Sequence, residues 1–337
     1  MLQRGGAPGA GVALLVDGAP ILDHSIGFRD IAQTQVLPEQ SRFYVYSITK
    51  VMVAVAILQL VEQGELGLDS PVQSYLPDLP VTTPVSLRQL LNHSGGLPDY
   101  GSLSAYGDAV RANPEQPWST AQFLAHTLRG ELLYAPGNGW HYSNIGYLLL
   151  AMVLEQSYGR SLQEVLLQHI FTPLDFRHTY VARSLEGVEA LSPGYTTFLN
   201  TSGVLEDMRI RYHPGWVAHG LVVSTAGELA RFQQALFDGR LLSANLLEAM
   251  CQPHPVPGTH RHFRQPGYGL GLMLDRQSPH GLVAGHGGGG PGYSTAAFYF
   301  SDIAQQEVVS VALVNRDQAD LGLEIAFALA EVIAAHS

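Results

Sequence analysis

Two segments near the start of the chain are predicted strands: residues 12–16, which are apolar throughout, and residues 21–26, where polar positions lie between apolar ends. These segments flank Asp17 and Gly18, a dipeptide typical of tight hairpin turns. Four further segments near the other end are rich in β-branched or aromatic residues and are bounded by Gly, Pro or Asp. They are residues 268–274, 281–284, 295–300 and 308–315. Because their connections are short, we expect the strands to pair antiparallel.

The middle of the chain has helical periodicity and many Pro and Gly breaks. Residues 47–62 are apolar on nearly every side of a helix, which predicts a buried central helix that ends near Gly64. Ser119 or Thr120 is the candidate N-cap of one of the shorter helices. The predicted helices are residues 86–92, 119–128, 144–157, 161–169, 224–238 and 321–335.

Strands at both ends and helices between them predict an α+β fold. We expect one antiparallel sheet flanked by helices, with a mainly helical region inserted between the two halves of the sheet. Residues 1–68 and 217–337 would form the α/β domain, and residues 69–216 would form the mainly helical domain. The active site is expected at the interface of the two domains.

Composition narrows the classes of function. The 337 residues are 46% hydrophobic and carry a net charge of -11, which argues against a nucleic-acid partner or an anionic membrane surface. Cys251 is the single cysteine, so no intrachain disulfide forms. No apolar run approaches the roughly 20 residues of a membrane span, and no signal peptide is visible. The location is expected to be cytoplasmic, or that of a trimmed secreted form, and the oligomeric state stays open.

Lysine usage singles out one position. Of the 18 basic residues only Lys50 is a lysine, and it lies in the predicted buried helix. Arginine serves as well as lysine in surface ion pairs, whereas only lysine readily loses its proton when buried. Ser47 precedes Lys50 by three residues, so both side chains share one helix face. A lysine that accepts the serine proton would activate the hydroxyl as a nucleophile.

Two later segments carry complementary chemistry. Tyr142 and Asn144 lie where a Pro/Gly loop enters a helix. The phenol can be held as phenolate beside an ammonium or can relay a proton, and the amide suits a substrate carbonyl. His286 precedes the four glycines 287–290 at a strand edge, where bare backbone N–H groups can stabilise an oxyanion. A histidine there can also move a proton near neutral pH.

Together these segments resemble the penicillin-recognising serine hydrolases: class C β-lactamases, D-alanyl-D-alanine carboxypeptidases, D-aminopeptidases and family VIII esterases. That family carries S-x-x-K, then Y-x-N, then K-T-G, H-x-G or W-x-G. The chain has these motifs in order at residues 47–50, 142–144 and 286–288. Segments 90–98, 136–147 and 221–225 are also similar to the family, so the resemblance covers nearly the whole chain. It implies the β-lactamase/transpeptidase-like fold.

The resemblance implies a role for each motif residue. Ser47 would attack a carbonyl and form an acyl-enzyme. Lys50 and Tyr142 would share the general-base and general-acid duties, and the sequence leaves open which of them takes the serine proton. Water activated by Tyr142 would then release the acyl group. Asn144 would orient the acyl side chain and Lys50, with no metal and no cofactor.

The third motif departs from the β-lactamases. His286 stands where class C β-lactamases have a lysine that helps hold the β-lactam carboxylate, which puts efficient β-lactam hydrolysis in doubt. His286 and Gly288 would contact the substrate, and the N–H groups of Ser47 and Gly289 would form the oxyanion hole. The expected substrate is a small ester, amide or D-peptide, cleaved by a carboxylesterase or D-stereospecific peptidase.

Other classes fit less well. A penicillin-binding or sensor module that acylates at Ser47 without turnover is the main alternative. A lipase-type α/β-hydrolase needs a G-x-S-x-G elbow after its glycine motif, and the nearest candidate, at residues 292–296, lacks the last glycine. A P-loop needs a lysine that the chain does not have. His260 and His262 lie in a loop without a zinc motif.

Overall fold

The N-terminal hairpin is formed as the turn signal predicts. The computed structural model describes residues 1–336. Strand β1 (Gly9–Val16) pairs with β2 (Ala19–Gly27), and the turn between them has positive φ at Asp17 (48°) and Gly18 (75°). Two consecutive positive φ angles match the twist of the flanking strands, which is why this dipeptide closes the hairpin.

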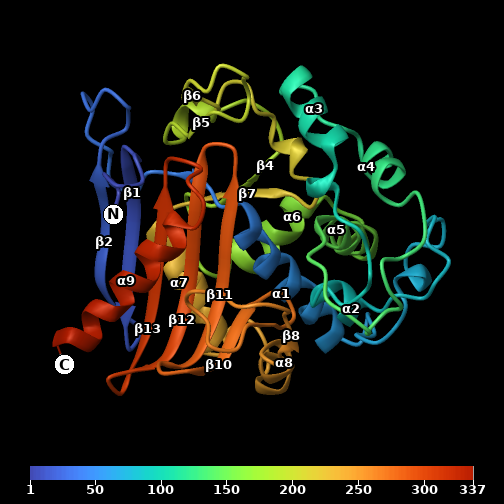
Figure 1. Ribbon diagram of the computed structural model, residues 1–337. Helices are drawn as coiled ribbons and strands as arrows, with labels where there is room; N and C mark the ends of the chain where they lie inside the picture. The colour runs from blue at the N-terminus through green and yellow to red at the C-terminus, as the bar shows by residue number, and fades with distance from the viewer. Residues whose placement is uncertain (337) are drawn as a thin grey trace.

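An eight-stranded sheet joins the two ends of the chain. Its order is β2-β1-β13-β12-β11-β10-β9-β8, and every pair is antiparallel. The C-terminal strands are β8 (His254–Pro255), β9 (Gly267–Tyr268), β10 (Met273–Ser278), β11 (Gly281–Gly290), β12 (Tyr293–Ile303) and β13 (Gln306–Val314). Because β1 lies beside β13, the first and last strands of the chain complete one sheet, as Figure 1 shows.

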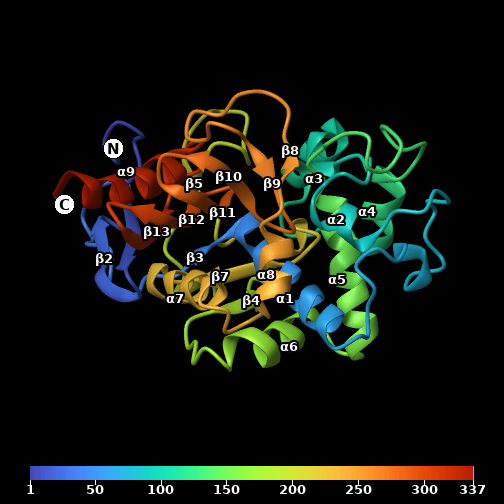
Figure 2. The same cartoon turned by 90° about the horizontal axis from the view of Figure 1, so that it is seen from below.

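Helices cover both faces of this sheet. Helix α9 (Leu321–His336) packs on one face and α7 (Ala226–Phe237) on the other, which is clearest in Figure 2. The alternation along β12 divides its side chains between them: Phe298 belongs to the cluster under α9, whereas Tyr299 stacks on Phe237 of α7 with ring centroids 4.0 Å apart. Burial on both faces explains why these strands read as continuous apolar runs.

The mainly helical region lies beside the sheet and surrounds α1 (Thr49–Glu62). Eleven of the 14 residues of α1 are buried, so its all-round apolar character is satisfied by neighbours on every side. The other helices are α2 (Leu87–Leu91), α3 (Ser104–Ala112), α4 (Thr120–Thr127), α5 (Asn144–Tyr158), α6 (Leu162–Leu166) and α8 (Ala244–Met250). Capping boxes at Ser86, Ser119 and Ser161 start α2, α4 and α6, and Ser119 is one of the two caps predicted for its helix.

Short elements tie the helical region to the sheet. A three-stranded sheet has the order β3-β7-β4, and a two-stranded sheet pairs β5 with β6. Single helical turns complete the connections. The strands are β3 (Phe43–Tyr44), β4 (Tyr180–Ala182), β5 (Tyr195–Thr196), β6 (Glu206–Asp207) and β7 (Leu221–Ser224), and the turns are η1 (Tyr46–Ile48), η2 (Val72–Ser74), η3 (Tyr100–Ser102), η4 (Leu167–Phe171), η5 (Val188–Ala190) and η6 (Pro214–Trp216).

Three predictions about elements need correction. The strand predicted over residues 268–274 is two strands, because Gly271 adopts φ +90° and turns the chain between β9 and β10. The predicted helix 161–169 is interrupted after α6 by the π-helical turn η4. The strand predicted at 281–284 continues through all four glycines. Backbone pairing with β12 keeps this segment extended, although glycine side chains give no strand signal in the sequence. Within residues 1–336, no helix combines the length and apolar character that a membrane crossing requires.

Candidate active site

Ser47 is presented by a strained turn at the start of α1. The preceding residue, Tyr46, has φ 45° although it carries a side chain, a conformation that costs on the order of 1–3 kcal/mol. Packing holds it there: Tyr46 is buried, its OH donates to the carbonyl of Pro291 (2.5 Å), and its ring lies against those of Tyr44 and Tyr293. The turn places the serine hydroxyl beside the glycine run of β11.

Lys50 is fully buried one turn after Ser47. Its Nζ lies 3.1 Å from Ser47 Oγ, as the i, i+3 spacing predicts. Burial lowers the pKa of Lys50 to about 7, because the ammonium loses its hydration, and the nearby Asp99 carboxylate opposes this shift. A large fraction of the side chain is therefore a neutral amine at neutral pH, which arginine in the same place would not be.

Tyr142 reaches the same hydroxyl from the helical region. Its OH donates to Ser47 Oγ over 2.8 Å, and Lys50 Nζ lies 4.9 Å from the centre of its ring. Burial raises the pKa of Tyr142 well above its usual value of 10. The resting side chain is therefore a phenol, and the phenolate considered from the sequence is not favoured before Ser47 loses its proton.

Asn144 connects Lys50 to a carboxylate that the sequence analysis missed. The side-chain oxygen of Asn144 accepts from Lys50 Nζ (2.7 Å). Asp99 accepts from the backbone N–H of Asn144 (2.8 Å) and from its side-chain amide (3.3 Å), which fixes the amide orientation. Burial raises the pKa of Asp99. Asp99 follows the helix-ending loop 90–98 and carries no motif of its own, so only the fold reveals it.

His286 is held as a neutral side chain. Its Nε2 lies 2.7 Å from the OH of Tyr268, and its Nδ1 lies 2.5 Å from the carbonyl of Gly287. Burial, together with the charge on Lys50, lowers the pKa of His286 to about 3. The idea that His286 moves a proton near neutral pH is therefore not supported. The sequence analysis did not predict that Tyr268 contacts His286. It placed Tyr268 in a single strand, residues 268–274, whereas the structure has two strands there.

The glycines of β11 fit the backbone of the nucleophile turn. A Cβ at Gly288 would overlap the carbonyl oxygen of Val45, and one at Gly290 would overlap the ring of Tyr46. Gly289 faces open space, with nothing within 4 Å of its Cβ position. Beyond Gly285, β11 pairs only with β12, so its other edge is free of strands. The oxyanion role of the Ser47 and Gly289 N–H groups stays a prediction.

A cavity of about 320 Å³ opens at Ser47. Its lining includes Ser47, Tyr142 and the glycine strand, together with two carboxylates, Asp317 and Asp320. Among residues 1–336, neither lysine nor arginine lines this cavity. The space is therefore suited to a small substrate whose charge, where it has one, is positive.

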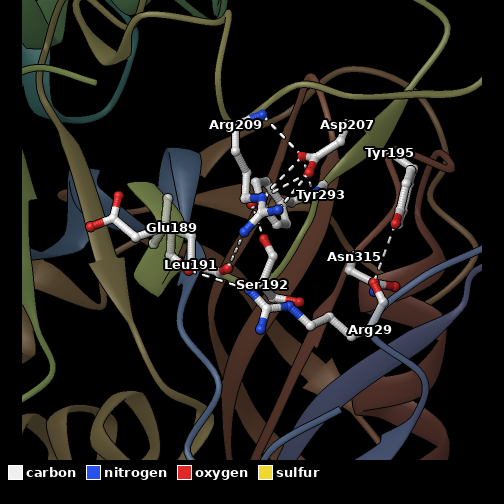
Figure 3. A network of polar contacts seen from close by, with 10 residues as sticks. Arg29, Glu189, Leu191, Ser192, Tyr195, Asp207, Arg209, Tyr293 and Asn315 are labelled. Atoms are coloured by element: carbon white, nitrogen blue, oxygen red, sulfur yellow. Dashed lines mark hydrogen bonds and ion pairs between the residues drawn. The ribbon is translucent and has the colours of Figure 1, made fainter. Parts of the chain in front are cut away.

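A polar network secures the wall of this cavity. Figure 3 shows the Arg209 guanidinium paired with Asp207 (2.7 Å) while it donates to the carbonyl of Leu191 (2.8 Å). The Tyr293 OH donates to the carbonyl of Ser192 (2.5 Å) in the same picture. Since the ring of Tyr293 also contacts Tyr46, this network connects the segment before β6 to the turn that presents Ser47.

The fold and the site together define a class. A serine, a buried lysine and a tyrosine meet beside a glycine strand of an antiparallel sheet, which is a β-lactamase/transpeptidase-like arrangement. The chain belongs to the Beta-lactamase family, whose model matches residues 1–333. The sequence analysis identified this family and fold, and both are confirmed.

Individual relatives support the same assignment. The chain is 31% identical to penicillin-binding protein 4* of Bacillus subtilis, over 87% of this chain and 65% of that protein. It is 25% identical to the D-aminopeptidase of Brucella canis, over 88% of this chain and 54% of that protein. It thus spans less than two thirds of each. A D-stereospecific amidohydrolase from Streptomyces sp. has a similar structure, with a TM-score of 0.80 and 28% sequence identity. The match covers 96% of this chain and 94% of that one.

Proposed function

We propose that the chain is a serine hydrolase that cleaves small amides or esters through an acyl-enzyme on Ser47. The observation that carries this proposal is the joint contact of Ser47 Oγ with Lys50 Nζ and the Tyr142 OH at the mouth of a cavity. A hydroxyl becomes a useful nucleophile only when a base accepts its proton, and both candidate groups are within reach.

Lys50 is the better base for acylation. Because its pKa is about 7, a substantial fraction of its amine is neutral near pH 7, and Tyr142 already donates its own proton toward Ser47 Oγ. As Oγ bonds to the substrate carbonyl carbon, its proton passes to Lys50 Nζ. Tyr142 then protonates the leaving nitrogen or oxygen and regains a proton from the Lys50 ammonium. Water repeats the sequence in reverse: it attacks the acyl carbon, gives up a proton through the same pair, and Ser47 is restored.

The charge of the cavity supports a choice among substrates. Asp317 and Asp320 favour a cationic group, and the neutral His286 offers no charge to a carboxylate. The D-aminopeptidase and D-stereospecific amidohydrolase relatives act, by their names, on D-configured substrates. We therefore expect amides of D-amino acids with a free ammonium group, or short neutral esters, to be cleaved better than β-lactams, whose carboxylate faces repulsion.

The division of the chain is part of the same proposal. Residues 1–68 and 217–337 would supply Ser47, Lys50 and His286, and residues 69–216 would supply Tyr142 and Asn144. The reacting groups would then meet at the interface of two domains. Such an arrangement is common for small-molecule sites.

The direct test compares three substrates with one variant. A D-amino-acid p-nitroanilide and p-nitrophenyl butyrate should be hydrolysed with higher kcat/KM than nitrocefin. Ser47→Ala should abolish all turnover and keep the unfolding temperature of the parent. Ester hydrolysis that survives in Ser47→Ala would refute the nucleophile, and nitrocefin turnover far above ester turnover would refute the substrate ranking.

Intact mass after brief exposure to each substrate separates turnover from trapping. A transient acyl adduct that disappears while product accumulates supports the hydrolase. One equivalent of product and a lasting adduct would instead identify a penicillin-binding or sensor module that acylates and stops.

A further inference from the structure

His219 is a buried side chain at the back of the site that the three motifs do not include. It is 2% exposed, and its Nε2 lies 3.1 Å from Lys50 Nζ. The other ring nitrogen, Nδ1, is buried without a hydrogen-bond partner among the described residues. A buried ring nitrogen without a hydrogen-bond partner is destabilising, so the contact that Nε2 makes with Lys50 calls for an explanation.

The loop that carries His219 is fixed on both sides. Before it, the indole N–H of Trp216 donates to Pro114 O (2.9 Å) and the Ala218 N–H donates to Tyr100 OH (3.1 Å). After it, Gly220 turns the chain with φ +93°, and the Val222 N–H donates to Thr49 Oγ1 (3.1 Å) on α1. The imidazole is thus held rigidly against Lys50 rather than resting there by chance.

The hydrogen-bond directions around Lys50 Nζ follow from its three partners. The Asn144 oxygen can only accept, because its amide donates to Asp99, so it takes one N–H of the amine. If His219 Nε2 also accepts, it takes a second. The remaining tetrahedral position of Nζ then faces Ser47 Oγ. In the neutral amine this position holds the lone pair, and in the ammonium it holds the third proton.

We propose that His219 is a positioning residue for the base: its Nε2 accepts one N–H of Lys50, so that the lone pair of the neutral amine faces Ser47. The imidazole carries its hydrogen on Nδ1. The opposite tautomer would donate to the lone pair and turn it away from the hydroxyl, which would leave Ser47 without a base. This inference rests on the proposed function, since it assigns a task only if Lys50 is the base.

The neighbours of His219 keep it neutral. Burial and the charge on Lys50 lower its pKa well below 6.5, and His286 and His93 act in the same direction. The ring of Tyr147 on α5 packs edge-on against it. Asp99 is the carboxylate that acts on the same lysine. His219 therefore stays an acceptor over the pH range in which Lys50 titrates.

The test follows the pH profile of kcat/KM for p-nitrophenyl butyrate in His219→Leu and His219→Gln. Leucine removes the acceptor, so kcat should fall about 10- to 100-fold, the range of a lost hydrogen bond to a charged group. The acidic midpoint of the profile should fall by about one unit, because the ammonium loses an acceptor. Glutamine keeps an acceptor and should restore most of the activity and the midpoint.

His213→Leu is the matched control. His213 lies on the same loop, where its Nδ1 accepts from the Gly215 N–H (3.0 Å). It should leave the midpoint unchanged. If His219→Leu does not fold, His219→Asn, whose shorter amide falls short of Nζ, replaces it. The role of His219 would be overturned if the acidic midpoint did not move in His219→Leu and if His219→Gln were no more active than His219→Leu. Turnover surviving in Ser47→Ala would instead overturn the proposed function.

Discussion

Two regions meet at Ser47, one that contacts it through polar side chains and one that offers only glycine backbone. The first is the polar cluster of Lys50, Tyr142, Asn144 and His219, in which side chains from distant parts of the chain contact one another around the buried amine of Lys50. The second is the glycine run of β11, which has no side chains to offer. There Gly288 and Gly290 admit the backbone of Val45 and the ring of Tyr46, and only Gly289 faces open space.

The two regions differ in what they control: the polar cluster sets the protonation of the reacting groups, and the glycine run sets the position of Ser47. In the polar cluster a substitution changes the protonation state of the remaining groups, because the pKa values of Lys50, Tyr142 and His219 depend on burial and on their neighbours. In the glycine run a substitution changes where Ser47 lies, because an added methyl group must displace the turn. Variants of the first region should therefore fold and fail in catalysis, whereas variants at Gly288 or Gly290 should lose stability and activity together.

The largest effect is expected at Lys50. Both Lys50→Met and Lys50→Arg should lower kcat/KM by about 10³-fold or more, the scale of losing a base that activates the nucleophile. Methionine cannot accept a proton, and a guanidinium stays charged at any accessible pH. Ester hydrolysis measures the loss, and circular dichroism checks the fold. An active arginine variant would show that a positive charge, not proton transfer, is what Ser47 needs.

Tyr142→Phe should cost about 10²-fold in kcat, the usual scale for a lost general acid or base. The phenol OH contacts Ser47 Oγ and is buried, so its removal leaves the shape of the site nearly unchanged. Amides should suffer more than p-nitrophenyl esters, because their leaving nitrogen needs a proton more. A loss below threefold for both substrates would reduce Tyr142 to a packing residue.

The sequence predicted the polar cluster only in part, and the reason is physical. Ser47 and Lys50 share a helix face, so their contact follows from spacing, and the lone lysine drew attention to it. His219 contacts the amine of Lys50 and Asp99 holds the Asn144 amide, both from loops, where no periodicity connects sequence position to space. Only the resemblance to a family identified Tyr142 among 15 tyrosines.

The glycine run was recognised as a motif but not as a structure. Glycine has low strand propensity, so the pattern ended the strand at residue 284, whereas pairing with β12 carries β11 to Gly290. Nor does a glycine reveal what it accommodates: Gly288 and Gly290 look the same as Gly289 in the sequence. The fold class was predictable because strands at both ends and helices between them permit few other architectures.

Gly288→Ala and Gly289→Ala form a matched pair in the second region. Alanine at 288 must displace the carbonyl of Val45, so it should lower the free energy of unfolding by about 1–3 kcal/mol and reduce hydrolysis with it. Alanine at 289 meets no atom within 4 Å and keeps its N–H, so stability should change little. Urea denaturation of both variants measures this. Equal losses would mean that the strand does not rest against the nucleophile turn.

The smallest effect is thermodynamic and tests the state of Lys50 without any substrate. Its pKa falls from 10.5 to about 7 on folding, so between these values the unfolded chain binds one proton more than the folded chain. Stability therefore rises with pH in this window, by about 1.4 kcal/mol per unit from this group. Below pH 7 both states carry the proton, and the full cost of the buried ammonium remains.

Lys50→Met isolates that contribution, since the variant keeps every other titrating group. The unfolding free energy of the parent minus that of Lys50→Met, from urea titrations between about pH 7.5 and 9.5, should increase with pH. The buried histidines gain their protons below this window, so they do not contribute to the slope. A flat difference would mean that Lys50 keeps its ordinary pKa when folded. The base would then have to be Tyr142, and Lys50 would act on Ser47 through its charge alone.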